Sequence, residues 1–450
     1  MKEISRFIAS GVYGHLDIDL TFNKELTFLY GLNGSGKTTA LKLMMALLEP
    51  SLAPLLSTPF DVAEVHGEDH EYGPVLIKAT KSRDNLVLTC SIINDNPFTL
   101  SMANLTAEEA LEAFSVEFKQ HPVYESLSRV SSPIFLGIDR RLRTPTARER
   151  LRPARSARQL AIEYERERFI QDPLFDPGLS EVAYIVEDFM RSIRRRQLSA
   201  DDRFRKIILL DAFSYITPEA GIPPEPDEAT FRDLTNKSEA IIQAFARLDL
   251  EEEVKKKCTE FFEKLEEVAA RVRTLMKSRK TGRVKENELS NAFMSWFVNK
   301  PQLERIDRLF KAAKSYQEDL EKITRPLDGF LQITNQFFAQ TGKTVVLRAG
   351  EILIEMAGKR RSIAALSSGE RQILIILAHL SLNQLLKKDG VFVIDEPELS
   401  LHMAWQDMFV DAVQSANPKL QLILATHSPA IIAGRDELCV PVAKEWPNHS

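Results

Sequence analysis

GLNGSGKTT, residues 31–39, stands between the apolar run ELTFLY (25–30) and the helical pattern of TTALKLMMALL (38–48). Glycines in such a loop let backbone N–H groups wrap around phosphate oxygens, while a lysine reaches the terminal phosphates. The hydroxyl of Thr38 is suited to ligate Mg²⁺. A glycine-rich structural turn is the alternative, but every slot of the P-loop pattern is filled. The stretch therefore predicts a nucleotide site made of Asn33, Gly34, Ser35, Gly36, Lys37, Thr38 and Thr39.

Two carboxylates end the apolar run of VFVIDEPELSLH, residues 391–402, which is typical of a buried parallel strand. We expect Asp395 to hold Mg²⁺ through water. We expect Glu396, pointing the other way along the strand, to polarise a water for attack on the γ-phosphate. An acidic pair at a strand end is usually a solvated terminus, but the P-loop favours the catalytic interpretation.

LSSGERQILIILAHL, residues 366–380, begins with a serine cap and continues as an apolar helix ahead of the acidic pair. In this stretch the chain resembles the signature motif of ABC ATPases. The resemblance implies that Ser367, Ser368, Gly369 and Glu370 face the γ-phosphate of ATP held by a second subunit. It also implies that residues 398–402 form the D-loop region. His427 would be the switch residue, which contacts the γ-phosphate and the attacking water.

The resemblance covers roughly residues 1–150 and 341–450, and it is closest to the SMC, RecF and OLD-like branch of these ATPases. It implies an α/β head with mixed and parallel sheets and flanking helices. The chain departs from the family pattern in one place, because no convincing Q-loop glutamine is found. PIFLGIDRR, residues 133–141, occupies the expected position and offers Asp139 with Arg140 instead.

Three parts are expected along the chain: a lobe with the P-loop at 1–150, a helical insertion at 151–340, and a lobe with the signature, the carboxylates and the histidine at 341–450. Two heptad-like seams predict a short antiparallel coiled coil in the insertion, with the turn at Gly282. Two helices of an ordinary bundle are the alternative. The seam positions are Val254, Cys258, Phe261, Leu265, Val268, Val272 and Leu275, then Leu303, Ile306, Phe310, Ala313, Gln317, Leu320 and Ile323.

The composition is that of a globular protein, with 44% hydrophobic and 27% charged residues and a net charge of −5. We expect a cytoplasmic protein without a membrane anchor, because no run approaches the ~18 apolar residues of a span and no signal peptide is seen. Three cysteines, too far apart in sequence for a CxxC motif, exclude a disulfide framework and a local zinc site.

Arginines are dense at residues 140–158, where Glu149 is the single acid. Such a segment binds phosphates or an acidic protein surface, so nucleic acid or an acidic phage protein is a candidate partner. A solvated charged helix is the alternative, since prolines interrupt the segment and no aromatic residue is available for stacking. The arginines are Arg140, Arg141, Arg143, Arg148, Arg150, Arg152, Arg155 and Arg158.

Three functions compete. The first is a sensor and scaffold ATPase of a two-gene anti-phage defence system, resembling AriA of PARIS and next PtuA of Septu, that uses ATP and Mg²⁺, dimerises head to head and acts through a separate effector, expected to be a nuclease. The second is a RecF-like repair or clamp ATPase that binds DNA directly. A transporter subunit is disfavoured by the large insertion. The stretch at 429–450 is too short for the Toprim-like nuclease domain of OLD proteins, so we expect no nuclease activity from this chain.

Overall fold

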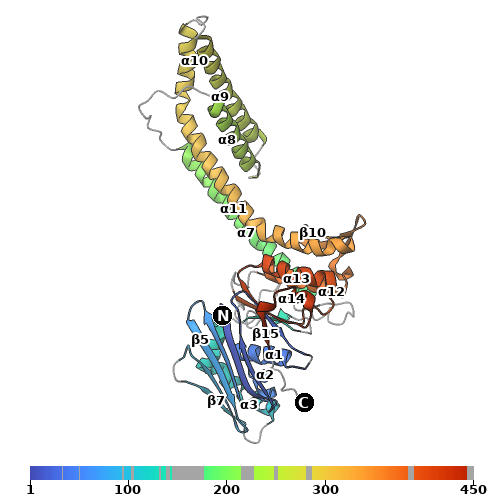
Figure 1. The fold of residues 1–450 in the computed structure, drawn as a ribbon. Helices are drawn as coiled ribbons and strands as arrows, with labels where there is room; N and C mark the ends of the chain where they lie inside the picture. Colours follow the sequence, from blue (N-terminus) through green and yellow to red (C-terminus); the bar gives the residue numbers. More distant parts are fainter. Residues whose placement is uncertain are drawn as a thin grey trace. The chain divides into compact units, whose positions relative to one another are not determined.

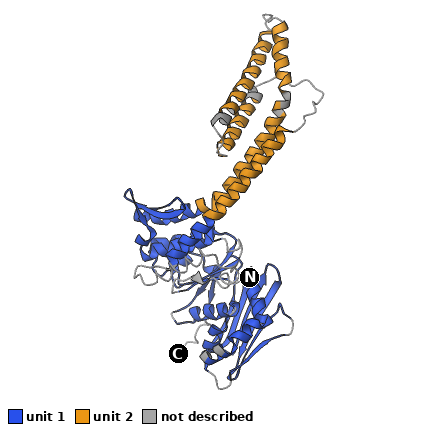
Figure 2. Ribbon diagram, turned by 180° about the vertical axis from the view of Figure 1, so that it is seen from behind, with its two compact units in different colours: residues 1–189, 329–450 blue, residues 190–328 orange. Residues whose placement is uncertain are grey.

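The structure is a computed structural model that describes residues 1–32, 34–49, 51–93, 96–102, 106–130, 133–137, 142–143, 177–213, 228–247, 252–279, 286–383 and 390–442. They divide into two compact units, Met1–Phe189 with Gly329–Ser450, and Met190–Asp328 (Figure 2). Helices α7 (Pro177–Ala212) and α11 (Lys300–Phe338) have residues in both units. The sequence places its boundaries near residues 150 and 340, and 144–176 lie outside the described residues.

The first unit contains an antiparallel six-stranded sheet in the order β2-β1-β4-β5-β6-β7 (Figure 1). Buried residues alternate along β4, β5 and β6, as expected for a sheet with one face on the core. Its strands are β1 (Glu3–Val12), β2 (Leu16–Thr21), β4 (Val62–Asp69), β5 (Gly73–Lys81), β6 (Asn85–Cys90) and β7 (Phe98–Ser101).

A second six-stranded sheet has the order β15-β3-β14-β13-β8-β9, and all its pairings are parallel except β8 with β9. Every residue of β14 is buried, as is typical of parallel strands covered on both faces. The strands are β3 (Leu26–Tyr30), β8 (Ile134–Leu136), β9 (Leu142–Arg143), β13 (Gly390–Asp395), β14 (Leu420–Ala425) and β15 (Cys439–Pro441).

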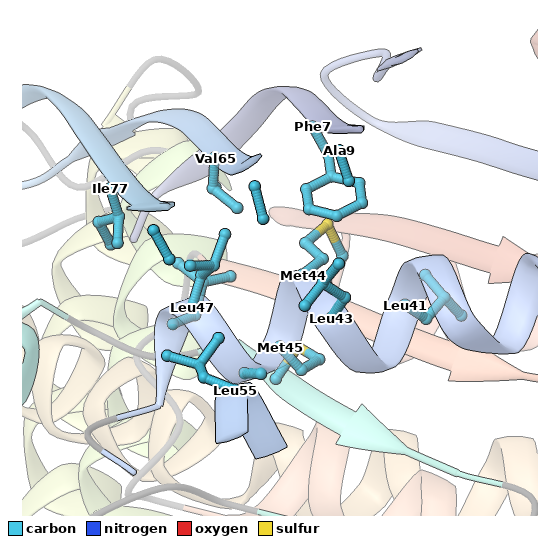
Figure 3. Packing of buried hydrophobic residues seen from close by; sticks show 14 of the residues in the cluster. Phe7, Ala9, Leu41, Leu43, Met44, Met45, Leu47, Leu55, Val65 and Ile77 are labelled. Carbon is cyan, nitrogen blue, oxygen red and sulfur yellow. The ribbon is translucent and has the colours of Figure 1, made fainter. Parts of the chain in front are cut away.

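Helix α1 (Lys37–Leu48) is the centre of the core, because its apolar side chains contact residues of both sheets. Leu43, Met44 and Leu47 pack toward Phe7 and other residues of the antiparallel sheet (Figure 3).

A third sheet has the order β10-β11-β12, with β10 (Lys343–Arg348), β11 (Glu351–Met356) and β12 (Lys359–Ser362). The other helices here are α2 (Ala53–Ser57), α3 (Ala107–Gln120), α4 (Pro122–Arg129), α12 (Ser368–Leu382), α13 (Met403–Ala416) and α14 (Pro429–Ile432).

The second unit consists of helices around one apolar cluster, contributed by α7, α8 (Glu228–Arg247), α9 (Glu252–Arg279), α10 (Glu286–Val298) and α11. Polar contacts join α7 to α11 in antiparallel order, since Asp201 bonds Tyr316 while Asp211, farther along α7, bonds the earlier Arg308. The predicted α/β fold with a helical insertion is confirmed.

Among the seam positions whose burial is described, which leave out Val254, Cys258 and Leu303, two differ from the prediction. Phe262 and Tyr316 are buried, whereas Phe261 is 37% exposed and Gln317 is partly buried. The reason is that several helices converge on this core, so each buries a broader face than a two-stranded seam requires. Gly282, the predicted turn, lies outside the described residues. In the described part of the chain, no helix is both long and apolar enough to cross a bilayer.

Candidate functional site

The P-loop joins the end of β3 to the start of α1. Gly34 and Gly36 have φ angles of 85° and 94°, in the left-handed region that glycine enters without strain. A Cβ atom on Gly36 would lie 2.6 Å from Cδ2 of Leu16, so the Leu16 side chain would have to move to accept any other residue. Ser35, Thr38 and Thr39 are partly buried here, and Asn33 lies outside the described residues.

Lys37 is the first residue of α1, and its side chain turns back into the loop. Its Nζ donates hydrogen bonds to the carbonyl oxygens of Gly31 at 2.8 Å and Leu32 at 3.2 Å. The residue is only 5% exposed, so this ammonium is held at the N-terminal end of a helix. Together with the helix amides it favours an anion at this position.

Asp395 ends β13 as a carboxylate that is 3% exposed. Burial raises its pKa, and the nearby hydroxyl of Thr38 opposes that shift. Neither carboxylate oxygen has a hydrogen bond of good geometry. A buried carboxylate without donors, beside a hydroxyl, fits a divalent cation such as Mg²⁺, which prefers oxygen ligands.

Glu396 follows the strand with a φ angle of 50°, an unusual conformation for a residue with a side chain. Its N–H donates to the carbonyl of Ala425 at 2.8 Å. The sequence predicted that Glu396 would alternate with Asp395 along one strand. Instead β13 ends at Asp395, and the backbone turns before Glu396.

Strand register brings these groups to one edge of the parallel sheet. Leu29 of β3 pairs with Ala425 of β14, and Ala425 pairs with Asp395 of β13. All three strands run in the same direction, so the segments that follow them leave the sheet at the same edge. That edge therefore gathers the P-loop, the acidic pair and His427.

His427 follows β14 and contacts the buried carboxylate of Glu398. Its Nδ1 lies 3.1 Å from Oε1 of Glu398, and its backbone N–H donates to the same oxygen at 2.9 Å. Oε2 of Glu398 accepts a hydrogen bond from the Thr426 hydroxyl at 2.8 Å. The sequence placed Glu398 only in the D-loop region and missed this contact, although a second carboxylate two residues after Glu396 was a visible signal.

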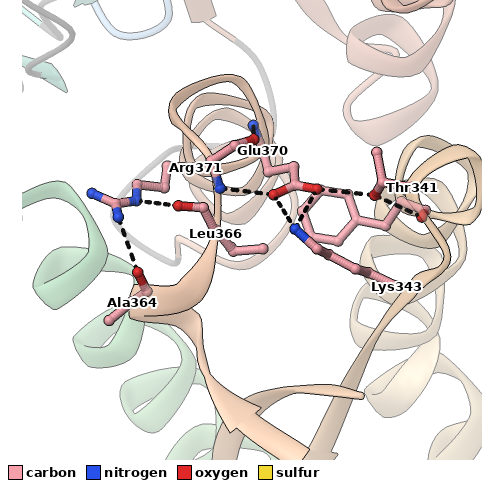
Figure 4. A network of polar contacts seen from close by, with 8 residues as sticks. Thr341, Lys343, Ala364, Leu366, Glu370 and Arg371 are labelled. Atoms are coloured by element: carbon pink, nitrogen blue, oxygen red, sulfur yellow. Dashed lines mark hydrogen bonds and ion pairs between the residues drawn. The ribbon is translucent and has the colours of Figure 1, made fainter. Parts of the chain in front are cut away.

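The predicted signature begins helix α12. Ser367 caps it in a capping box with Glu370, whose carboxylate accepts from the Ser367 N–H at 2.8 Å. Glu370 also accepts from Thr341 at 2.9 Å and from Nζ of Lys343 at 2.7 Å (Figure 4). Burial alone would raise the pKa of Glu370, but the hydrogen bonds from Lys343, Ser367 and Thr341 outweigh burial and lower it. Lys343 is a further residue that the sequence analysis missed.

Gly369 packs directly against the loop after β13, because a Cβ atom at this position would lie 2.4 Å from the carbonyl oxygen of Ser400. Ser367 and Ser368 remain exposed on the outside of the unit. The contacts of Glu370 with Thr341 and Lys343 come from the segment after α11 and from β10, neither of which carries the P-loop. Asp139 and the arginines at 140–158 lie outside the residues whose side chains are described.

Two known proteins with ATPase names are similar to part of the chain. "Retron Vc95 probable ATPase" of Vibrio cholerae serotype O1 biovar El Tor is 30% identical over 125 residues, 28% of this chain and 24% of the relative. "Retron Ec83 probable ATPase" of Escherichia coli is 22% identical over 171 residues, 33% of this chain and 31% of the relative. The chain thus spans about a quarter to a third of the length of these relatives.

Two solved structures are similar at low score. One is the Smc head domain with an extended coiled coil, bound to the C-terminal domain of ScpA, derived from Pyrococcus furiosus, with 13% identity and a TM-score of 0.38. The other is the Smc head domain with a coiled coil and joint, derived from Pyrococcus yayanosii, with 15% identity and a TM-score of 0.37. They align with 96% of this chain and with 92% and 93% of their own lengths.

A protein-family profile matches residues 128–433, which include β8, α12, β13 and His427. The P-loop precedes the matched range. Since the match extends over more than half of the chain, this protein belongs to the family described as "AAA domain, putative AbiEii toxin, Type IV TA system".

Proposed function

We propose that the chain binds ATP with Mg²⁺ at the edge formed by β3, β14 and β13, and hydrolyses it. The observation that carries this proposal is the strand register, which brings Lys37, Asp395 and His427 to one edge. The buried, donor-free carboxylate of Asp395 supports it further.

Each residue has a proposed role at that edge. Backbone amides at Asn33–Thr39 and the Lys37 ammonium hold the phosphates, while the Thr38 hydroxyl and Asp395 hold Mg²⁺. The bound Mg²⁺ neutralises negative charge on the phosphate oxygens. Glu396 takes a proton from the attacking water, and His427 orients that water against the γ-phosphate.

The signature residues are proposed to act on a second copy. Ser367, Ser368 and Gly369 begin a helix, so their amides form an electropositive end suited to a γ-phosphate. The exposure of both serines supports contact with another molecule. Two such copies would enclose the nucleotides head to head.

The proposed ATPase is tested with purified protein, by measuring ATP binding and phosphate release with Mg²⁺ and with EDTA. We expect slow, Mg²⁺-dependent hydrolysis that Lys37→Ala abolishes together with ATP binding. The same substitution at exposed Lys24 serves as the control and should leave both unchanged. Full turnover by Lys37→Ala would contradict the proposed site.

The cellular role that we propose is an ATPase of an anti-phage defence complex, which holds and releases or activates a separate effector, with a nuclease as the first candidate. The names of the relatives support this role, since two are named "Retron … probable ATPase" and the family description includes the words "putative AbiEii toxin, Type IV TA system". Purification from the native operon tests it. We expect a second polypeptide to copurify with this chain. The amount that copurifies should differ between the Lys37→Ala and Glu396→Gln proteins. Bound DNA without a protein partner would favour a repair or clamp function instead.

A further inference from the structure

Glu398 is a carboxylate for which the proposed hydrolysis provides no direct role. It is 8% exposed and lies in the loop after β13, two residues beyond Glu396. Both of its oxygens are occupied by the segment after β14, through Thr426 Oγ1 on one side and through the backbone N–H and Nδ1 of His427 on the other. This buried carboxylate is therefore directed at the segment that carries His427.

The segment that carries His427 is held firmly in other ways. The N–H of Ser428 donates to Thr426 Oγ1 at 3.0 Å, and the hydroxyl of Ser428 donates to Oε1 of Gln406 at 2.7 Å. The bond between Ser428 and Gln406 does not involve Glu398, whereas the Thr426 hydroxyl and the backbone N–H of His427 both donate to that carboxylate. The contact between Oε1 of Glu398 and Nδ1 is different, because it acts on the imidazole ring itself.

The contact between Oε1 of Glu398 and Nδ1 of His427 affects which ring nitrogen carries the proton. An ionised carboxylate only accepts hydrogen bonds, so a distance of 3.1 Å between Oε1 of Glu398 and Nδ1 favours the tautomer that carries the proton on Nδ1. In the neutral ring Nε2 is then unprotonated and can accept a hydrogen bond. The side chain of His427 is 45% exposed at the edge of the sheet, which leaves Nε2 for the substrate side.

We propose that Glu398 is a positioning residue that fixes the orientation and the Nδ1–H tautomer of His427, so that Nε2 faces the γ-phosphate and the attacking water. This inference rests on the proposed function, and it adds a residue that acts only through His427. The same logic operates wherever a carboxylate holds a histidine in one tautomer for a reaction at its other nitrogen.

The tautomer is measured directly by ¹⁵N NMR of His427 in the nucleotide-free protein. We expect a protonated Nδ1 and an unprotonated Nε2 in the wild type, a loss of this preference in Glu398→Ala, and its retention in Glu398→Gln, whose amide oxygen can still accept from Nδ1–H. A wild-type ring protonated mainly at Nε2, or one that exchanges freely between tautomers, overturns the proposal. The NMR measurement does not depend on ATPase activity. It can therefore contradict the role of Glu398 without contradicting the proposed ATPase function, and the reverse.

Steady-state kinetics test whether Glu398 affects ATP hydrolysis through His427. Glu398→Ala should lower kcat about tenfold or more with little change in the KM for ATP, and Glu398→Gln should recover part of that loss. In a His427→Ala background, Glu398→Ala should have less than about a twofold further effect. If Glu398 had only a structural role, the fold-losses in kcat of the two single variants would multiply in the double variant, and Glu398→Ala would also lower the Tm. Glu64→Ala, which removes a carboxylate beside His66 in the other sheet, is the matched control and should leave kcat unchanged.

Discussion

At the scale of single residues, Asp395 and Glu396 show how neighbouring carboxylates acquire different chemistry. Asp395 is enclosed at the end of a strand, where burial raises its pKa and the Thr38 hydroxyl only partly offsets that rise. Glu396 is turned out of the strand by a left-handed backbone that costs about 1 kcal/mol for a residue with a side chain. Such strain at a site is often kept because it directs a functional group.

Replacing Glu396 with Gln retains the shape of the side chain and removes the charge that activates water. Hydrolysis should therefore fall by ~10²-fold or more, while ATP remains bound. Single-turnover phosphate release and a filter-binding assay measure the two effects separately, and the dimer should persist in ATP by light scattering. Wild-type turnover by Glu396→Gln would transfer the role of general base to another residue, with His427 as the first candidate.

At the scale of secondary structure, the ion pair of Lys343 and Glu370 ties β10 to the first turn of the signature helix. The side chain of Glu370 is 2% exposed and that of Lys343 is 17% exposed, so the pair is largely shielded from water. Removing one partner of such a pair leaves an uncompensated charge, which costs more than an exposed ion pair contributes.

Lys343→Met should lower the free energy of unfolding by about 3 kcal/mol at neutral pH, judged from buried pairs in general. The wild-type pKa of Glu370 lies below its ordinary value, so this stabilisation is present above the unfolded pKa and is lost as pH falls through the folded pKa. The difference between variant and wild type should therefore shrink below about pH 4. Urea unfolding at several pH values measures it. Lys2→Met, which removes a half-exposed pair with Glu68, should change stability by less than about 0.5 kcal/mol.

Local patterns explain which elements could be predicted from sequence. The P-loop, β13 and α12 are each defined within about fifteen consecutive residues by glycines, an apolar run or a serine cap. The contacts of Glu398 with His427 and of Lys343 with Glu370 join residues from separate elements, and no local pattern records which strands will be neighbours. Phe262 and Tyr316 were missed for a related reason, since a heptad pattern considers two helices and the bundle contains more.

At the scale of the whole molecule, the P-loop and the signature lie on different helices of one chain. The P-loop is fixed by β3 and α1, whereas the signature helix is fixed by β10 and by the close approach of Gly369 to Ser400. This arrangement is compatible with a composite site, to which one copy contributes Lys37 and its partner contributes Ser367.

A mixing experiment tests the composite site. Lys37→Ala and Ser367→Arg proteins should each be inactive, yet their mixture should regain part of the ATPase rate. In a mixed dimer one site combines an intact P-loop with an intact signature, whereas the other site lacks both. The measurement is phosphate release at increasing ratios of the two proteins, alongside a crosslinking assay for mixed dimers. No recovery, when mixed dimers demonstrably form, would place the signature in the same copy as the nucleotide.

The strand order of the parallel sheet has a consequence for how the protein is made. β3, which leads into the P-loop, is flanked by β14 and β15, and Gln421 at the start of β14 bonds the backbone of Ile4 and Asn23. A ribosome that adds ~5–20 residues per second synthesises β14 roughly 20–80 s after β3. During that interval the backbone N–H and C=O groups along both edges of β3 lack the strands with which they pair in the fold. The helices of the second unit, α8 to α10, are synthesised in the same interval, so they exist on the nascent chain before β14 completes the parallel sheet of the first unit.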